Sequence, residues 1–542
     1  MIETPIAPSR KLGYTQLYLD FLAGAGSARK FYSSQNADVT ARALDRIQFD
    51  RQATVSILRR QNETFGSSPA VFAAIDKLAD PHAVCIFAGQ QAGLFGGPMM
   101  TLLKALAIAK ASRTLSTQLS RPVVPVFWIA ADDHDLDEVN HTFLLNRLGA
   151  LQRVDYHGRP EMALPLGQIQ LEDGLSLEQP MQSFRETLGE TEFTRELYEL
   201  LERCYNPDNT FVTAFGKLMA ALTAEYGLVL FTPNDREVKA LARPFLRQVI
   251  EKQDLLHALL SERNQAVQSA GYHLQVQKQD NAAYLFVDLD GRKPVHRRGN
   301  DFTVGDRNFT KQELIALLES EPERFSPDVT TRPIFQAWLS PTAVQMGGPS
   351  EIAYFAQGNV IFDLFERPLP VHLARPTLTF VEKRFGKLMN EQAISFEEVA
   401  GDIEQVINRI MNKSFPEDIE GRYEQLRSEI RRQFDLFSEE SLNFDPSLRG
   451  FAEQTSGKID FALKTFESKL FTAHKKRSTD LRERIYRLQN ALWPNGAFQD
   501  RSLNVANFVA RYGYTFVSWL YESVDPLAPG PKLISLSEDN TK

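Results

Sequence analysis

Short apolar runs alternate with helical patterns through the first half of the chain. Residues 84–87 form such a run, residues 88–93 are rich in glycine, and residues 94–110 return to the spacing of a helix. Residues 123–130 form a second run, which ends in acidic residues, and residues 227–231 form a third. Runs of this length suit buried strands, and a strand, a tight turn and a helix make the first half of a βαβ unit. The pattern therefore predicts an α/β fold with a parallel sheet.

Two stretches interrupt this alternation, and we expect both to be inserted segments. Residues 151–225 are polar and mixed, with helical spacing toward their end. Residues 273–309 alternate as short strands, first 273–277 and then 283–287, with a turn and a basic strand after them, which is typical of a small antiparallel sheet. The basic strand carries a cluster that could meet a substrate carboxylate, although a solvated hairpin face is the favoured alternative: Arg292, Lys293, His296, Arg297 and Arg298.

From about residue 378 the pattern becomes that of long helices. Apolar positions recur at spacings of three and four, break at residues 443–446, and then continue to residue 492. This heptad-like spacing predicts two or three long antiparallel helices that form a coiled coil. A hairpin of that length has a long exposed edge, so we expect a symmetric homodimer. The predicted apolar seam consists of Tyr423, Leu426, Ile430, Phe434, Phe437, Ile459, Leu463, Phe466, Leu470, Ala473, Leu481, Ile485, Leu488 and Leu492.

The glycine-rich segment after the first strand is a candidate anion site. Free backbone N–H groups at a helix start attract anions, and glycine lets a ligand approach the backbone without meeting a Cβ atom. The spacing matches neither the Walker P-loop nor the dinucleotide-binding fingerprint, and a plain strand-to-helix turn is the alternative. The candidate ligand-binding residues are Gly89, Gln90, Gln91, Gly93 and Gly97.

A second candidate cluster follows the next predicted strand. Asp133 and His134 come directly after it, and more carboxylates follow as far as Glu138. The carboxyl ends of parallel strands are where open α/β sheets bind ligands. Carboxylates this close together repel one another unless a metal ion, an amine or a substrate ammonium shares the site. We predict catalytic roles for Asp133 and His134. The alternative is that Asp135, Asp137 and Glu138 cap the next helix, and it is favoured for Asp137 and Glu138.

A third loop resembles the first in leading to a helix start. Gly347, Gly348 and Ser350 precede Glu351, which could cap the helix, bind an ammonium group or act as the base that frees an attacking amine. Just upstream, Arg332 precedes a proline on a segment that we expect to be extended. Its guanidinium offers a cation for a carboxylate or a phosphate.

Composition narrows the class of protein. A chain of 542 residues is expected to hold two or more domains. Its net charge of −8 argues against nucleic-acid binding. The sequence has no leader-like apolar segment and no apolar stretch of about 18 residues, so we expect a cytoplasmic protein that does not span a membrane.

The cysteines and histidines do not form a recognisable metal site. Cys85 and Cys204 are the two cysteines, which excludes a disulfide framework and a Cys-rich zinc site. Cys85 lies inside the first predicted strand, where a packed small apolar side chain is expected. Ligands drawn from the single turn around His134 would give poor tetrahedral geometry, so we predict no protein-bound metal.

The chain contains four ordered motifs: GQQAG at residues 89–93, WIAADDHDLDE at 128–138, GGPSEIAY at 347–354 and WPNGAFQDR at 493–501. In this order they resemble the BshC family, the cysteine ligases of bacillithiol biosynthesis. Together they extend over essentially the whole chain. Two features depart from the family pattern: the first loop is richer in glycine, and Ser350 stands where glycine is usual.

The resemblance implies an architecture and a reaction. It implies a Rossmann-like core related to class I aminoacyl-tRNA synthetases in residues 1–377, with the inserted segments, and a coiled-coil domain in 378–492. The sequence itself predicts that residues 493–542 return to the core. A loop with Asn495, Gln499 and Arg501 could then reach the ligand site, although chain reversal alone would explain the proline and glycine of this motif. The implied reaction joins the carboxyl group of L-cysteine to the amine of glucosaminyl-malate, the last step of bacillithiol synthesis.

ATP is the implied co-substrate, by analogy with the synthetases. The sequence has neither an HIGH-like histidine pair nor a KMSKS loop. Gln90 and Gln91 stand where such histidines are expected, and they can donate hydrogen bonds to phosphate but carry no charge. The alternatives are a non-catalytic, dimeric nucleotide-binding scaffold and a nucleotidylyltransferase that acts on another small acid. Only an enzyme would show nucleotide turnover that depends on the substrate.

Overall fold

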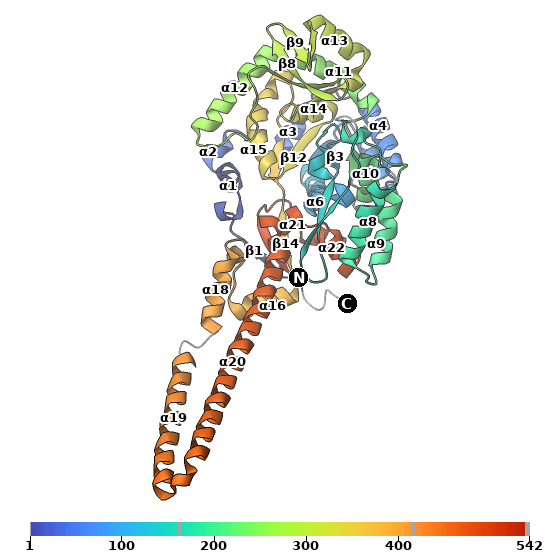
Figure 1. Cartoon of the computed structure of the whole chain (residues 1–542). Helices are drawn as coiled ribbons and strands as arrows, with labels where there is room; N and C mark the ends of the chain where they lie inside the picture. The colour runs from blue at the N-terminus through green and yellow to red at the C-terminus, as the bar shows by residue number, and fades with distance from the viewer. Residues whose placement is uncertain (1, 161–163, 173, 415–418, 537–542) are drawn as a thin grey trace. The chain divides into compact units, whose positions relative to one another are not determined.

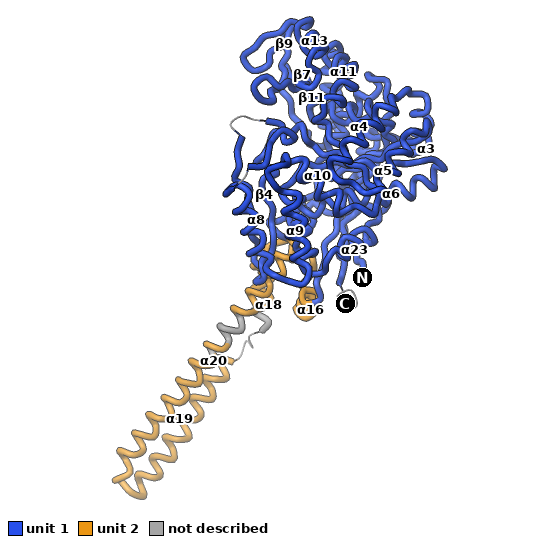
Figure 2. Tube along the Cα trace, turned by 90° about the vertical axis from the view of Figure 1, so that its right-hand side faces the viewer, with its two compact units in different colours: residues 1–383, 494–542 blue, residues 384–493 orange. Residues whose placement is uncertain are grey.

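The chain forms two compact units. The computed structural model describes residues 2–160, 164–172, 174–414 and 419–536, so residues 537–542 of the predicted C-terminal segment lie outside the described part. One unit contains residues 1–383 and 494–542, and the other contains residues 384–493, as Figure 2 shows. The first unit therefore combines both ends of the chain.

A five-stranded parallel sheet forms the centre of the first unit (Figure 1). Its order is β13-β12-β2-β3-β6. The chain runs outward from β2 through β3 and β6, and then returns to the other side of β2 with β12 and β13. This is the Rossmann strand order, and it confirms the predicted fold class. The strands are β2 (Val84–Gln90), β3 (Val123–Ile129), β6 (Val229–Phe231), β12 (Thr342–Gly347) and β13 (Val371–Ala374).

Both faces of the sheet are covered, which explains the continuous apolar runs. Successive side chains of a strand point to opposite faces. In β2, Ile86 accordingly joins the apolar cluster that contains helix α6, whereas Phe87 joins the cluster that contains α11 and α14. Helix α6 (Met100–Leu119) connects β2 to β3 and is buried around most of its circumference. Helix α15 (Pro349–Gly358) follows β12.

The two interrupting segments form a helical layer and a second sheet. The first contains the hairpin of β4 (His141–Leu145) and β5 (Leu151–Asp155), then α8 (Leu175–Leu188), α9 (Thr194–Cys204) and α10 (Phe211–Leu222). The second contributes to an antiparallel sheet of order β10-β9-β8-β7-β11. Its strands are β7 (Ala282–Asp288), β8 (Arg292–Arg298), β9 (Asp301–Val304), β10 (Arg307–Phe309) and β11 (Phe325–Pro327).

The predicted strand at residues 273–277 is wrong. The backbone N–H groups of Gln275 and Val276 donate to the side-chain oxygen of Gln357, at 2.9 and 3.0 Å, instead of to a neighbouring strand. Alternation of apolar and polar residues alone could not reveal that a side chain would take these bonds.

The remaining elements of the first unit surround the sheet. A small sheet of order β1-β15-β14 joins β1 (Ile2–Pro5) and β15 (Pro531–Ser535) to β14 (Thr377–Val381). The main surrounding helices are α1 (Gln16–Leu22), α3 (Ala37–Leu44), α4 (Arg51–Thr64), α5 (Pro69–Asp76), α11 (Arg236–Glu251), α12 (Gln253–Ser269), α13 (Lys311–Ser320), α14 (Arg332–Leu339), α21 (Gln499–Ser502), α22 (Ala506–Tyr512) and α23 (Thr515–Ser523).

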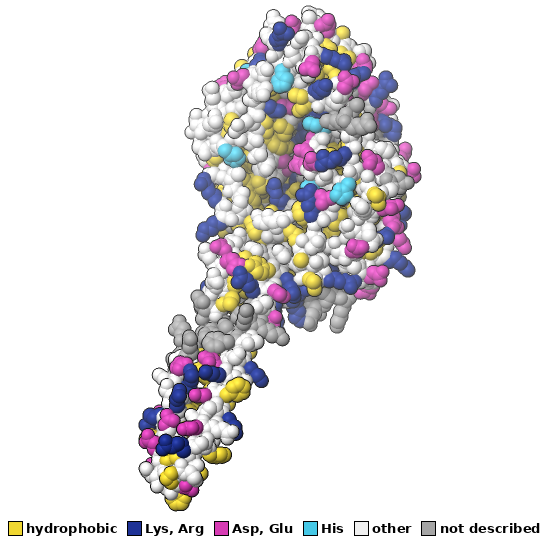
Figure 3. All heavy atoms as spheres, in the orientation of Figure 1, with side chains coloured by type: hydrophobic (Ala, Val, Ile, Leu, Met, Phe, Trp, Pro, Cys, Tyr) yellow, Lys and Arg dark blue, Asp and Glu magenta, His cyan; other side chains and the backbone are white. Residues whose placement is uncertain are grey.

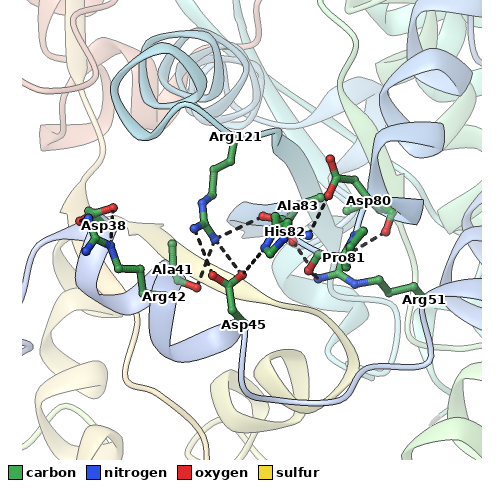
Figure 4. Close-up of polar contacts among 11 residues, drawn as sticks. Asp38, Ala41, Arg42, Asp45, Arg51, Asp80, Pro81, His82, Ala83 and Arg121 are labelled. Carbon is green, nitrogen blue, oxygen red and sulfur yellow. Dashed lines mark hydrogen bonds and ion pairs between the residues drawn. The ribbon is translucent and has the colours of Figure 1, made fainter.

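Polar contacts fix the amino ends of the central strands (Figure 4). Arg121, just before β3, donates to both carboxylate oxygens of Asp45, at 2.9 and 3.1 Å. Arg51 donates to the carbonyl oxygens of Leu78, Pro81 and Ala83 around the start of β2. Burial raises the pKa of Asp45, but hydrogen bonds from Arg121 and His82 outweigh it and leave the pKa below its ordinary value. These contacts lie at the opposite edge from the strand carboxyl ends.

The second unit contains a long helical hairpin. Its helices are α18 (Ile403–Ser414), α19 (Ile419–Phe444) and α20 (Arg449–Leu492), and α16 (Lys383–Gln392) begins at the boundary between the units. The two long helices confirm the helical pattern, and Pro446 interrupts them as expected. Among the described residues, no helix combines the length and the apolar character needed to cross a membrane.

Candidate active site

A cavity of about 600 Å³ opens at the carboxyl ends of β2, β3 and β12. It lies where the strand order reverses between β2 and β12, which is where Rossmann-like sheets bind ligands. Figure 3 shows acidic, basic and histidine side chains around an apolar hollow on this face. The cavity is lined by residues of the first, second and third motifs and by Arg501 of the fourth.

Most of the predicted site residues line this cavity, although their roles remain predictions. Those that line it are Gly89, Gln90, Gln91, Asp133, His134, Arg332, Gly348, Ser350, Glu351 and Arg501. Those that do not are Gly93, Gly97, Gly347 and Asn495. Each residue of the second group lies in the same loop or motif as residues of the first group, so the distinction depends on local geometry.

The first loop is not a cradle of free N–H groups, and that interpretation of Gly93 and Gly97 is wrong. Their N–H groups donate within the loop, to the carbonyl oxygens of Gln91 and Leu94 at 3.1 and 2.9 Å. Close packing explains the glycine at position 93, because an added Cβ atom would lie 2.6 Å from the Cα atom of Gly97. The N–H group of Met99, just before α6, donates to the carbonyl of Leu503 at 2.8 Å.

Local structure also explains Gly347 and Asn495, which do not line the cavity. A Cβ atom on Gly347 would lie 2.8 Å from side-chain atoms of Glu351 and Phe355, so this glycine lets β12 approach α15. Asn495 is exposed and occupies the left-handed region with φ of 53°, where it serves the chain reversal after Trp493.

A buried lysine that sequence analysis missed joins the first and third loops. Lys104 of α6 is 2% exposed, and its ammonium donates to Gly89 O and Gln90 Oε1, both at 3.0 Å. It also forms an ion pair with Glu351. Burial lowers the pKa of Lys104, and the charge of Glu351 opposes that shift. A lysine inside an apolar helix was the signal, because such a cation needs a partner.

Glu351 both caps α15 and neutralises Lys104. Its carboxylate accepts a hydrogen bond from the Gly348 N–H group at 2.8 Å and faces the Lys104 ammonium. The capping alternative is therefore correct in geometry, and the carboxylate also lines the cavity.

The acidic side of the cavity consists of Asp132, Asp133 and Glu138, which follow β3. The amide nitrogen of Gln91 donates to Asp133 and to Glu138, at 2.7 Å in each case. The other Asp133 oxygen accepts from the His134 N–H group at 2.8 Å. The helix-capping role predicted in this turn belongs to Asp135, which accepts from the Glu138 N–H group at 3.2 Å at the start of α7 (Leu136–Val139).

Protein cations offset part of this negative charge. Lys239 of α11 is 1% exposed and lies 2.7 Å from Asp132. Arg292 of β8 lies over the Phe286 ring and contacts His134 Nδ1 at 3.2 Å, so the solvated-face alternative is wrong for this arginine. No three His, Cys, Asp or Glu side chains in the described ranges are grouped so that they could hold a metal ion.

The basic side of the cavity consists of Lys104, Arg332, Arg375 and Arg501. Arg332 begins helix α14 and is not extended as predicted, because proline is tolerated in the first turn of a helix. Arg375 follows β13 and pairs at 2.6 Å with Asp500 of the fourth motif, and both side chains are buried. A Cβ atom on Gly348 would lie 3.3 Å from Arg375 Nε, so Gly348 leaves room for this arginine.

The two cysteines lie away from the cavity lining. Cys85 is buried in β2, and burial raises the pKa of its thiol to about 12. Burial likewise raises the pKa of Cys204 to about 11. Both thiols therefore stay protonated near neutral pH and behave as small packed side chains.

Comparisons with known proteins extend over nearly the whole chain. The family model described as "Bacillithiol biosynthesis BshC, N-terminal Rossmann-like domain" matches residues 1–376. The model described as "Bacillithiol biosynthesis BshC, C-terminal coiled-coil domain" matches residues 378–536.

Full-length relatives agree with these matches. A protein from Koribacter versatilis is 31% identical over 94% of this chain and 95% of its own length. One from Geobacillus thermodenitrificans is 30% identical over 94% and 96%, and one from Chlorobaculum tepidum is 30% identical over 87% and 86%. Each is named "Putative cysteine ligase BshC". The predicted family resemblance is confirmed.

Proposed function

Because the chain belongs to the BshC family of bacillithiol biosynthesis, we propose that it is a cysteine ligase. The reaction joins the carboxyl group of L-cysteine to the amine of glucosaminyl-malate, and ATP is the co-substrate that activates the carboxyl group. The amine nitrogen forms the new C–N bond, the activated carboxyl oxygen leaves with phosphate or AMP, and the amine gives up one proton.

The observation that supports this proposal is the cavity at the switch point of the sheet. Its volume of about 600 Å³ suits small-molecule substrates. Its acidic side suits an amine or an ammonium group, and its basic side suits carboxylate or phosphate oxygens. Both substrates carry an amine and a carboxyl group, so a cavity with two charged sides can orient them.

The hydrogen bonds of Asp133 and Glu138 indicate different roles for these two carboxylates. Asp133 has both oxygens engaged, by Gln91 and by the His134 N–H group, so it holds this turn in place. Among the described residues, the Glu138 carboxylate accepts one hydrogen bond, from Gln91, and its side chain lines the cavity. Glu138 is therefore the carboxylate best placed to bind the amine and to accept its proton.

His134 is better suited to orient a substrate than to remove a proton. Arg292 has no proton acceptor of its own, so its contact with Nδ1 makes that nitrogen the acceptor. In the neutral ring, the hydrogen then lies on Nε2, which can donate to a substrate oxygen. Glu351 is likewise engaged, by Lys104 and by the Gly348 N–H group, and so acts as a positioning residue for the third loop.

Mass spectrometry of the purified protein with ATP, L-cysteine and glucosaminyl-malate tests the proposal. We expect a product whose mass equals the sum of the two substrates less one water, together with AMP or ADP. Neither product should form when one substrate is left out. Binding of ATP without any turnover would contradict the proposal and would favour the nucleotide-binding scaffold.

A further inference from the structure

The cations of the cavity differ in whether they are already neutralised. Lys104 faces Glu351, Arg375 faces Asp500, and Lys278 lies 3.0 Å from Asp328. In the part of the chain that the structure describes, Arg332 and Arg501 have no carboxylate within 4.0 Å.

Among the described residues, Arg292 also lacks a carboxylate at that distance, but each of its three side-chain nitrogen atoms already contacts a protein acceptor. Their N–H groups are directed to Ser326 Oγ, His134 Nδ1 and the Pro327 carbonyl, at 3.1, 3.2 and 3.3 Å. Protein groups therefore hold the Arg292 guanidinium in the wall of the cavity.

Arg332 is held in place and still has donors to spare. Its guanidinium lies 5.6 Å from the centre of the Trp128 ring, and it donates to Gln336 Oε1 at 3.2 Å and to the Tyr354 hydroxyl at 3.4 Å. A guanidinium has more N–H groups than these two contacts use. Restraint by an aromatic face and by neutral partners keeps an arginine ready for an anion without neutralising it.

The surroundings of Arg332 favour an anion. Its charge and that of Arg375 both contribute to lowering the pKa of Lys104, so the three cations lie close enough to repel one another. The nearby carboxylates Glu351 and Asp500 balance Lys104 and Arg375, which leaves the charge of Arg332 uncompensated. Burial raises the pKa of Tyr354 to about 12, so its hydroxyl keeps its hydrogen and remains a donor.

We propose that Arg332 and Tyr354 anchor an oxyanion subsite on the basic side of the cavity. The subsite takes a carboxylate or phosphate group, and within the proposed function, on which this inference rests, that group is either the malyl carboxylate of the acceptor or a phosphate of ATP. Bidentate contact with the free edge of the guanidinium would fix the anion, while the acidic side beyond β2 receives the amine.

Isothermal titration of the full chain with L-malate and, separately, with ATP tests the subsite. Arg332→Met keeps an apolar stem on Trp128 but removes the guanidinium, and should weaken binding of one probe by about 10-fold or more. Arg332→Lys keeps the charge but not the planar arrangement of donors. Its affinity for that probe should lie between those of the wild type and of Arg332→Met. The control is Arg298→Met, an exposed arginine of β8 that bonds Asn308 and does not line the cavity.

The two probes identify the source of the anion. Weaker L-malate binding with unchanged ATP binding assigns the malyl group, and the reverse assigns a nucleotide phosphate. Unchanged binding of both probes to Arg332→Met overturns the subsite, as does a wild type that binds neither probe. If Arg332→Met does not fold, Tyr354→Phe takes its place, and unchanged binding of both probes by that variant would count equally against the subsite.

These binding measurements are independent of turnover. If the wild type makes no ligated product but binds an anion through Arg332, the proposed ligase function fails and the subsite stands. If product forms and neither probe depends on Arg332, the subsite fails and the function stands.

Discussion

The two units differ in how far they bury their large apolar side chains. In the first unit, these residues form two continuous cores on the two faces of the central sheet. In the long hairpin of the second unit, many of them remain exposed, and Figure 3 shows apolar patches on its surface. The exposed residues are Leu426, Leu436, Phe437, Phe444, Leu448, Phe451, Phe461 and Phe466.

Buried side chains of the first unit stabilise its fold, whereas exposed side chains of the hairpin are available for contact with another surface. In the first unit, charged pairs such as Lys104–Glu351 and Arg375–Asp500 are largely shielded from water by the protein around them, which makes the loss of one partner costly. The hairpin has ion pairs between exposed side chains, such as Arg487–Glu483, which contribute little to stability. Apolar side chains that a single chain leaves exposed instead mark a surface for association.

The largest expected effect comes from opening a buried pair in the first unit. Lys104→Met would leave Glu351 without its cation and would free the Gly89 and Gln90 oxygens. We expect the free energy of unfolding to fall by about 3–5 kcal/mol, measured by urea denaturation. Arg487→Met in the hairpin is the matched control and should leave the denaturation midpoint of the first unit unchanged. Equal midpoints for both variants would remove the distinction between the units.

Activity should depend on the acidic side of the cavity without a change in fold. Asp133→Asn keeps the size of the side chain but weakens its contacts with Gln91 and His134. We expect product formation to fall by about 100-fold or more, which corresponds to about 2.7 kcal/mol. Asp137→Asn, on an exposed side chain of the same turn, is the control. A normal rate for Asp133→Asn would show that this turn does not serve the reaction.

The sequence was sufficient to predict where the strands end, and so where the cavity lies. Buried strands such as β2 and β3 appear as local apolar runs, and the polar residues after them necessarily reach one edge of a parallel sheet. Lys104 lies in an apolar helix, which indicates that it needs a partner but not which residue that partner is, because Glu351 lies 247 residues away.

Two errors arose instead from local geometry. Gly93 has the composition of an anion loop, but whether its N–H group is free depends on how the loop folds onto itself. For Arg332, the rule that residues before proline are extended competed with the tolerance of proline in the first helical turn, and the helix prevailed.

The first unit should lose stability in mild acid. His372 of β13 is buried, its ring nitrogens lack hydrogen-bond partners within the described ranges, and burial lowers its pKa from 6.5 to about 3. Because the unfolded chain binds the proton more tightly, the stability from neutral His372 is complete above about pH 6.5. It is lost as the pH falls toward 3, at about 1.4 kcal/mol per pH unit.

Urea denaturation at about pH 7 and about pH 5 measures this dependence. His372→Gln should flatten it, whereas His82→Gln, on an exposed side chain, should not. An unchanged slope in His372→Gln would mean that the ring is not the group that titrates.

Changes in the hairpin should have the smallest effect on the stability of the first unit, and should instead alter the association of the chain. We propose that its exposed aromatic residues pack against a second copy of the chain. Phe461 and Phe466 of α20 are 73% and 62% exposed, so Ser in their place removes apolar area without opening a cavity in the monomer. Leu463 and Leu470 are only half-buried, so they too depend on a further surface to cover them.

Sedimentation of the wild type and of the double variant Phe461→Ser, Phe466→Ser tests this association. The wild type should sediment as a dimer at micromolar concentration and the variant as a monomer, because each large apolar side chain contributes about 1.5–3 kcal/mol when buried. The urea midpoint of the first unit should stay the same in both, since its cores contain none of these residues. A wild type that is monomeric throughout would exclude self-association, and the exposed aromatic residues would then have to face a different protein.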